Sequence, residues 1–300
     1  TNNIYIAKVE DLKKEKIEIE NIESGKFKVW FKTNLNNYQK IAKSLLSIAQ
    51  VNKLLSDLKL QNKTSLTNQE IEKFYEKAYL IGAKDLVEAE ERIKGLTFET
   101  GYAFYNDKKL NSILGKRDEK GLFLSMTELF KGAPATQKIS SKGAIITHNH
   151  PLQFPMSIYT ADSDWRGDSF SLDDIESTCQ LSAKELRVVV WLNSQKTIYT
   201  LTKSNGQNFS SGEKSALKSH YEYFEEAINS DGIYTLDSEK KMFQTLLTLA
   251  KKRISAAGMN FDDVADGESA HLFISHEIWE IIFRDRNKEL KQNLYIYKRL

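Results

Sequence analysis

The sequence has little cysteine, and it lacks the apolar segments that mark a membrane or exported protein. Its single cysteine, Cys179, cannot form an internal disulfide, which suits a reducing compartment. No run of about eighteen apolar residues occurs, so we predict no membrane span. The first residues lack the charged-then-apolar pattern of a signal peptide, and we expect none. A buried apolar role is the simplest interpretation of Cys179.

Proline and glycine are also scarce, and no charge of one sign dominates. Three prolines and fourteen glycines exclude collagen-like or linker-like chains, while 40% hydrophobic and 28% charged residues are ordinary for globular proteins. The formal net charge is only +2, which argues against broad nucleic-acid binding. At 300 residues, two structural units are the default expectation, although one large unit fits the same length.

The pattern of apolar residues divides the chain into three regions: 1–93, 94–204 and 205–300. The first begins with two short alternating segments, 17–22 and 27–31, and turns helical from Asn37. The third is helical, with a final helix predicted from His276 to Tyr297. The middle region mixes strands (96–105, 143–147, 187–192 and 197–201) with helices (121–131 and 171–183). We therefore predict an α+β fold with a mixed sheet and helical N- and C-terminal regions.

The end of the predicted strand at 143–147 carries the first candidate site. His148 and His150 are two residues apart, so on a strand their imidazoles point to the same face and can converge on one ion. Pro151 ends the strand, because it cannot donate to the ladder. Taken alone, the pair is better explained as two polar residues at a strand end.

A second candidate lies at the start of the helix at 171–183. Ser171 and Asp174 have the spacing of a capping box, in which both side chains bond the helix N-terminus. Capping alone explains both residues, but the Asp174 carboxylate is also a suitable metal ligand. Two histidines and one carboxylate leave a fourth tetrahedral position open, as catalytic zinc sites do.

Glu99 is the best candidate for a general base that is not itself a ligand. On the predicted strand it alternates with small neighbours, which leaves room for a water and a substrate. A carboxylate between aromatic residues on a strand is locally unfavourable, and such conflicts tend to mark functional sites. The alternative is a charge on a solvated sheet face.

The order of these segments resembles the JAMM (JAB/MPN+) metallopeptidase family over roughly residues 94–204. The motif is Glu99, then His148-Asn149-His150-Pro151, then Ser171-Leu172-Asp173-Asp174. The local sequence is most similar to JAB-like domains of phage minor head proteins and of bacterial toxins. One departure is the segment 152–170, which is longer than the family's usual spacing and can form a lid or a substrate-shaping loop.

The resemblance implies a role for each residue of the motif. His148, His150 and Asp174 would bind Zn²⁺, Glu99 would activate the metal-bound water, and Ser171 would hold the oxyanion or simply cap its helix. The implied fold is a mixed sheet flanked by helices. The implied reaction is hydrolysis of a peptide or isopeptide bond in a protein or peptide substrate, often beside a ubiquitin-like modifier.

The resemblance also bears on source and partners. We expect a bacterial or phage-encoded cytoplasmic protein, with a virion or a secreted toxin as other locations. The alternative function is a structural or interaction protein of phage-head type, in which the JAMM-like domain is a scaffold and the helical flanks bind assembly partners. A DNA-repair relative of the family is disfavoured by the near-neutral charge.

Overall fold

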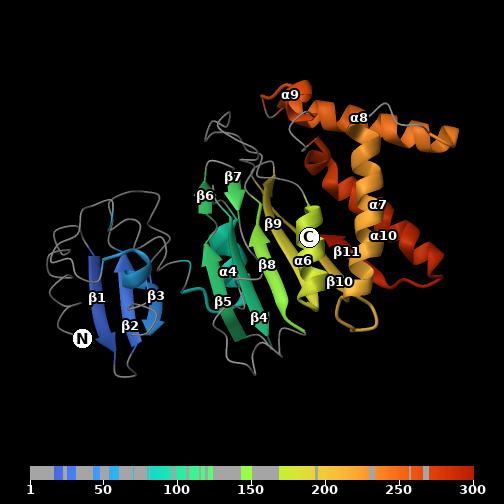
Figure 1. The fold of residues 1–300 in the computed structure, drawn as a ribbon. Coiled ribbons are helices and arrows are strands. Elements are labelled where there is room, and N and C mark those ends of the chain that lie inside the picture. The colour runs from blue at the N-terminus through green and yellow to red at the C-terminus, as the bar shows by residue number, and fades with distance from the viewer. Residues whose placement is uncertain are drawn as a thin grey trace. The chain divides into compact units, whose positions relative to one another are not determined.

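The computed structural model divides the chain into two compact units, residues 1–84 and 85–300, which are described separately (Figure 1). The second unit thus begins before the predicted boundary at 94 and includes the whole C-terminal region. The structure describes residues 17–22, 26–31, 43–47, 54–60, 70, 80, 82–94, 96, 99–105, 108–114, 116–118, 121–123, 143–150, 169–192, 195–229, 234–256, 258–265 and 270–300.

The first unit contains a three-stranded antiparallel sheet in the order β1-β2-β3. Its strands are β1 (Ile17–Ile22), β2 (Lys26–Phe31) and β3 (Lys43–Ser47). The strands predicted at 17–22 and 27–31 are confirmed. The helical interpretation of Leu45 and Leu46 is wrong, because both lie in β3 and pair with β2. In so short a run, two adjacent leucines fit both helical and strand periodicity, and pairing with β2 makes the segment a strand.

The second unit is built on a six-stranded mixed sheet with the order β11-β10-β9-β8-β4-β5. Neighbouring strands are antiparallel except β8 and β9, which are parallel. The strands are β4 (Thr100–Tyr105), β5 (Lys108–Leu114), β8 (Ile145–Asn149), β9 (Glu185–Leu192), β10 (Gln195–Lys203) and β11 (Tyr295–Arg299). The predicted α+β class with a mixed sheet is therefore confirmed. β8 lies between β4 and β9, which places the His148 segment inside the sheet.

Helices cover both faces of this sheet (Figure 1). They are α4 (Leu86–Ile93), α6 (Leu172–Gln180), α7 (Ser211–Asn229), α8 (Asp237–Ala256), α9 (Phe261–Ala265), the 3₁₀ helix η3 (Ala270–Ile274) and α10 (Ser275–Glu289). α4 packs on β8 and β4 from one face. On the other face Ile146 and Val188 join one buried core with Leu217 of α7 and Trp279 of α10. Cys179 is buried in the same core, as expected, and burial raises the pKa of its thiol to about 12.

The C-terminal region differs from the prediction in its last segment. The final helix ends at Glu289, and residues 295–299 form β11, which pairs with β10. Lys291 adopts a left-handed backbone with φ 52°, which ends the helix. The Asn287 side chain then accepts from the backbone N–H of Tyr295 (2.8 Å) and donates to its carbonyl (2.9 Å). These two bonds turn the chain back onto the sheet edge.

Two further predictions about secondary structure need correction. The strand predicted over 96–105 begins only at Thr100, so Glu99 lies just before it. Gly121–Phe123, predicted as the start of a helix, is strand β7, paired with β6 (Lys116–Asp118). β6 supplies the backbone hydrogen bonds that hold β7 as a strand, and the local periodicity of the sequence does not indicate this pairing. The predicted lid segment at 152–170 lies outside the described residues up to residue 168.

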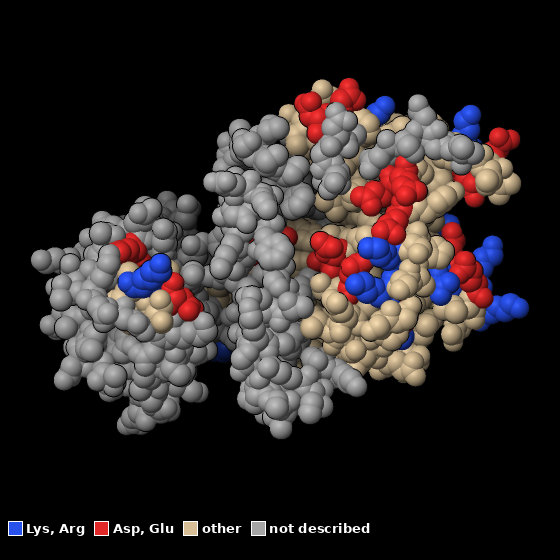
Figure 2. Space-filling model, in the orientation of Figure 1, with Lys and Arg blue, Asp and Glu red and all other residues tan. Residues whose placement is uncertain are grey.

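Basic and acidic side chains lie close together on the surface of the described residues, as Figure 2 shows for one face. Glu176, for example, pairs with Lys214 at 3.1 Å and with Lys218 at 2.9 Å. Among the described helices, none is long and apolar enough to cross a membrane.

Candidate metal centre

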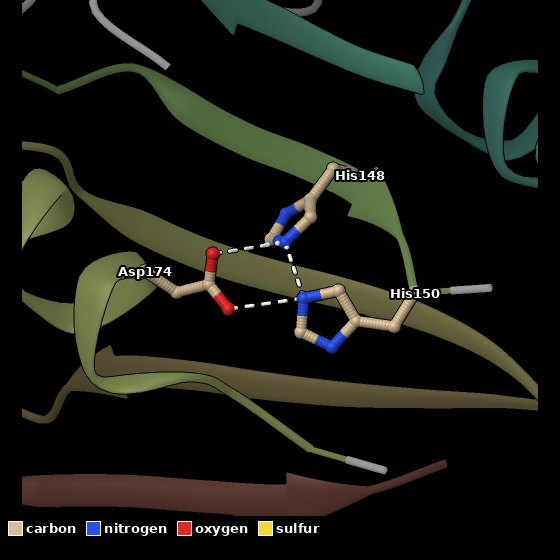
Figure 3. Close-up of side chains that lie close together, drawn as sticks. All are labelled: His148, His150 and Asp174. Atoms are coloured by element: carbon tan, nitrogen blue, oxygen red, sulfur yellow. Dashed lines mark hydrogen bonds and ion pairs between the residues drawn. The ribbon is translucent and has the colours of Figure 1, made fainter. Parts of the chain in front are cut away.

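His148 lies in β8 and His150 directly follows it, and both side chains point to the same side of the sheet (Figure 3). Their Nε2 atoms are 2.9 Å apart, and their rings meet edge to face. His148 is only 1% exposed, because it lies on the core face between β4 and β9. Its partner on β4 is Gly101, which has no side chain to fill that position. The alternation predicted from the sequence therefore brings the two imidazoles together.

Asp174 reaches the same point from the first turn of α6. Its Oδ1 lies 3.0 Å from Nε2 of His148, and its Oδ2 lies 3.1 Å from Nε2 of His150. The predicted capping box is present: the Ser171 N–H donates to Oδ2 of Asp174 (2.7 Å), and the Asp174 N–H donates to Oγ of Ser171 (3.1 Å). The box fixes the carboxylate at the helix N-terminus, where the helix dipole favours negative charge. Capping and ligation thus require the same carboxylate position.

The three side chains form a triangle of donor atoms that fits a metal ion. Their ligand atoms lie within 4.8 Å of one another, and the closest contacts are 2.9 to 3.1 Å. In a tetrahedral zinc site with bonds of ~2.0–2.1 Å, adjacent ligand atoms are about 3.3 Å apart. The donors are thus spaced almost as an ion would hold them. A buried group of His148, His150 and Asp174 can therefore bind a metal ion.

The outer nitrogens of the two rings have different surroundings. Nδ1 of His150 lies 3.1 Å from the backbone carbonyl of Ser169 and can donate to it, which leaves a lone pair on Nε2 facing the centre. Nδ1 of His148 is buried and has no hydrogen-bond partner among the described residues. A hydrogen bond to a carbonyl on the far nitrogen is the usual way in which proteins orient a metal-binding histidine.

Asp174 also interacts electrostatically with the two histidines. Burial by itself would raise the pKa of Asp174, but His148 and His150 hold that pKa well below its usual value. The carboxylate is therefore ionised, which is the form that binds a cation.

Glu99 lies directly before β4, beside the segment that carries the two histidines. In the β4–β8 register Gly101 is opposite His148, so continuing the register by two residues places Glu99 opposite His150. Burial raises the pKa of Glu99, whereas the charges of His150 and His148 lower it and that of Asp174 raises it. The candidate base and the candidate ligands are thus within electrostatic reach of one another.

Two residues without a predicted role help to build the site. The Oδ1 atom of Asn149 accepts from the backbone N–H of Thr100 at 2.7 Å, which fixes the chain next to Glu99. The Ser169 carbonyl is the partner of His150. Both interactions join segments far apart in the sequence, so no local pattern could have indicated them.

Comparisons with protein-family models, with curated proteins and with solved structures give no match for this chain.

Proposed function

We propose that this chain is a zinc-dependent hydrolase of JAMM type, which cleaves a peptide or isopeptide bond. The observation that carries the proposal is the meeting of His148, His150 and Asp174 at one buried point, with Glu99 within electrostatic reach of all three. The motif order in the sequence adds the family resemblance. The spatial grouping is independent of that resemblance, because it joins β8, α6 and the residue before β4.

The donor set favours zinc in a catalytic site. Imidazole nitrogen and carboxylate oxygen are both common zinc ligands, and structural zinc sites use four protein ligands, most often with several cysteines. Here the described residues supply three ligands, and the only cysteine of the chain lies in the core. Three protein ligands leave one position for water or substrate. When bound, zinc lowers the pKa of a coordinated water and polarises the scissile carbonyl.

In this mechanism Glu99 acts as the general base and then as the general acid. Its carboxylate accepts a proton from the attacking water and passes it to the leaving amine. Burial raises the pKa of Glu99, which favours proton uptake, while a bound dication would oppose that rise. Ser171 has two roles in the proposal: its Oγ accepts the helix N–H of Asp174, and its hydroxyl proton remains available to an oxyanion.

The test is turnover by wild type and by Glu99→Gln, with zinc content measured on the same samples. The substrates are a fluorogenic peptide library and isopeptide-linked conjugates of ubiquitin-like modifiers. We expect wild type to cleave at least one class, and Glu99→Gln to retain zinc and lose about 10²–10⁴-fold in rate. Glu91→Gln, an exposed charge on α4, is the control and should keep wild-type activity. Equal turnover by Glu99→Gln and wild type would contradict the assigned base.

A second candidate function is a structural or interaction protein of phage-head type. The observation in its favour is that α7, α8 and α10 share one core with the sheet, although none of the three candidate ligands lies on them. Zinc binding without turnover of any substrate, together with stoichiometric recovery of the chain in a larger assembly, would support this candidate.

A further inference from the structure

A three-residue segment, Ser169 to Ser171, connects both sides of the candidate metal centre. At one end the Ser169 carbonyl lies 3.1 Å from Nδ1 of His150. At the other end the Ser171 N–H donates to the Asp174 carboxylate at 2.7 Å. The separation between the two ligands therefore depends on where this short segment lies. Ser169 is 1% exposed, so water does not compete for its contacts.

The C-terminal part of the chain fixes this segment with two hydrogen bonds. The Tyr297 hydroxyl of β11 lies 2.5 Å from Oγ of Ser169. The indole N–H of Trp279, in α10, donates to the Phe170 carbonyl at 2.8 Å. The rings of Phe170 and Tyr297 also meet edge to face, 5.7 Å apart. Each successive residue of the segment is therefore held by a named partner.

Tyr297 is itself held in one position. Its hydroxyl lies 2.8 Å from Nδ1 of His276, and its ring stacks at 6.3 Å on Tyr199 of β10. His276 is buried on α10. A run of polar contacts thus extends from α10 through β11 to the metal-facing histidine: His276 to Tyr297, Tyr297 to Ser169, and Ser169 to His150.

We infer that Tyr297 is a positioning residue for the metal centre, acting on His150 through Ser169. The inference rests on the proposed metal site, and it assigns to β11 and α10 a part in that site. Partners of this kind, beyond the ligands themselves, orient the imidazole and commonly change metal affinity by about 10–100-fold when they are removed. The polar nature of the contact matters, since packing alone would be served by a phenylalanine at 297.

The test is Zn²⁺ affinity of the full chain, measured by competition with a chelating dye, for wild type and Tyr297→Phe. This variant keeps the ring and removes only the hydroxyl. We expect it to bind Zn²⁺ about tenfold more weakly. The matched control is Tyr295→Phe, on the same strand, which removes a hydroxyl that donates to Glu213 at 3.1 Å. The control should bind Zn²⁺ within about twofold of wild type.

Two further measurements separate positioning from a general loss of structure. The metal-free unfolding midpoints of Tyr297→Phe and Tyr295→Phe should shift alike, and only Tyr297→Phe should change the visible absorption spectrum of the Co²⁺-loaded chain. Ser169→Ala should weaken Zn²⁺ binding as Tyr297→Phe does. The double variant should bind little more weakly than either single variant, because both changes remove the same interaction. If wild type binds no Zn²⁺, the proposed site itself is overturned. If wild type binds and Tyr297→Phe binds equally well, only the positioning role is overturned.

Discussion

The Nε2 atom of His148 lies 2.9 Å from the Nε2 atom of His150 at the end of β8. Two neutral imidazoles can share such a contact only when one of the facing nitrogens carries a proton. A cation removes this constraint, because both nitrogens can then offer lone pairs together with Asp174. The contact between the two rings therefore leads to a direct prediction about metal content.

Substitution His148→Ala should abolish metal binding, because it removes one of the three buried ligands that form the triangle. We expect about one Zn²⁺ per wild-type chain and almost none in the variant, as measured by plasma mass spectrometry of dialysed, tag-free protein. His220→Ala, on α7 and outside the cluster, is the control and should keep its zinc. Full zinc retention by His148→Ala would show that the ion is held elsewhere.

Substitution Ser171→Gly separates the two roles of Ser171. Glycine caps a helix nearly as well as serine, within a few tenths of a kcal/mol, whereas alanine costs about 1 kcal/mol. Ser171→Gly should therefore keep the unfolding free energy near that of wild type, while Ser171→Ala lowers it. If the hydroxyl holds the oxyanion, both variants lose turnover, with kcat falling and KM unchanged. Normal kcat in Ser171→Gly would leave only the capping role.

The parts of the site that the sequence could predict are those within one short segment. The His148 and His150 spacing fixes a common strand face, and the Ser171 and Asp174 spacing fixes a capping box, and the structure has both features. In each case the periodicity of the backbone alone sets the direction of the side chains. The meeting of the two segments was an expectation of the family resemblance and not of the local pattern.

The parts that could not be predicted depend on long-range pairing. The local sequences of β11 and β3 fit a helix as well as a strand, and pairing with β10 and β2 makes both segments strands. The link from Tyr297 to Ser169 depends on β11, so a helix ending at Tyr297 could not have indicated it. Roles in zinc binding and catalysis stay predictions.

The pH dependence of stability should include a component from His271. This buried imidazole packs against the Tyr221 ring, and Glu225 lies 3.5 Å from its Nδ1, yet burial lowers the pKa of His271 to about 4. Unfolded histidine titrates near 6.5, so as the pH falls the unfolded chain takes up the proton first. Stability should therefore fall between about pH 6.5 and pH 4, by roughly 2–3 kcal/mol from this group.

The measurement is urea unfolding at pH 7 and pH 4.5 in the presence of a chelator, for wild type and His271→Phe. The variant cannot titrate at this position. Between pH 7 and pH 4.5 its unfolding free energy should therefore fall by roughly 2–3 kcal/mol less than that of wild type. An equal loss in both proteins would mean that His271 is protonated in the folded chain, for instance by pairing with Glu225.

Substitution Glu90→Gln should destabilise the second unit, because Glu90 holds α4 to the sheet. Its carboxylate is 2% exposed and accepts from Nε of Arg187 at 2.5 Å, from Nη2 of Arg187 at 3.0 Å and from the Thr147 hydroxyl at 3.2 Å. Removing its charge leaves Arg187 with only Glu185, at 2.8 Å, as a described carboxylate partner. Loss of one partner of a buried pair costs about 3–5 kcal/mol, and the lower end applies here because Glu185 remains.

The matched control for this change is the neighbouring ion pair between Lys196 and Glu91, which spans the same helix and the sheet at 3.0 Å. Glu91 is half exposed, so water screens the pair, and Lys196→Met should change stability by about 1 kcal/mol or less. Urea midpoints at constant m give both values.

Because Thr147 precedes His148 on β8, a shift of α4 would also disturb the strand that carries both histidines. Glu90→Gln should therefore weaken Zn²⁺ binding, and Lys196→Met should not. Comparable stability losses in the two variants would show that burial adds nothing to the Glu90–Arg187 pair.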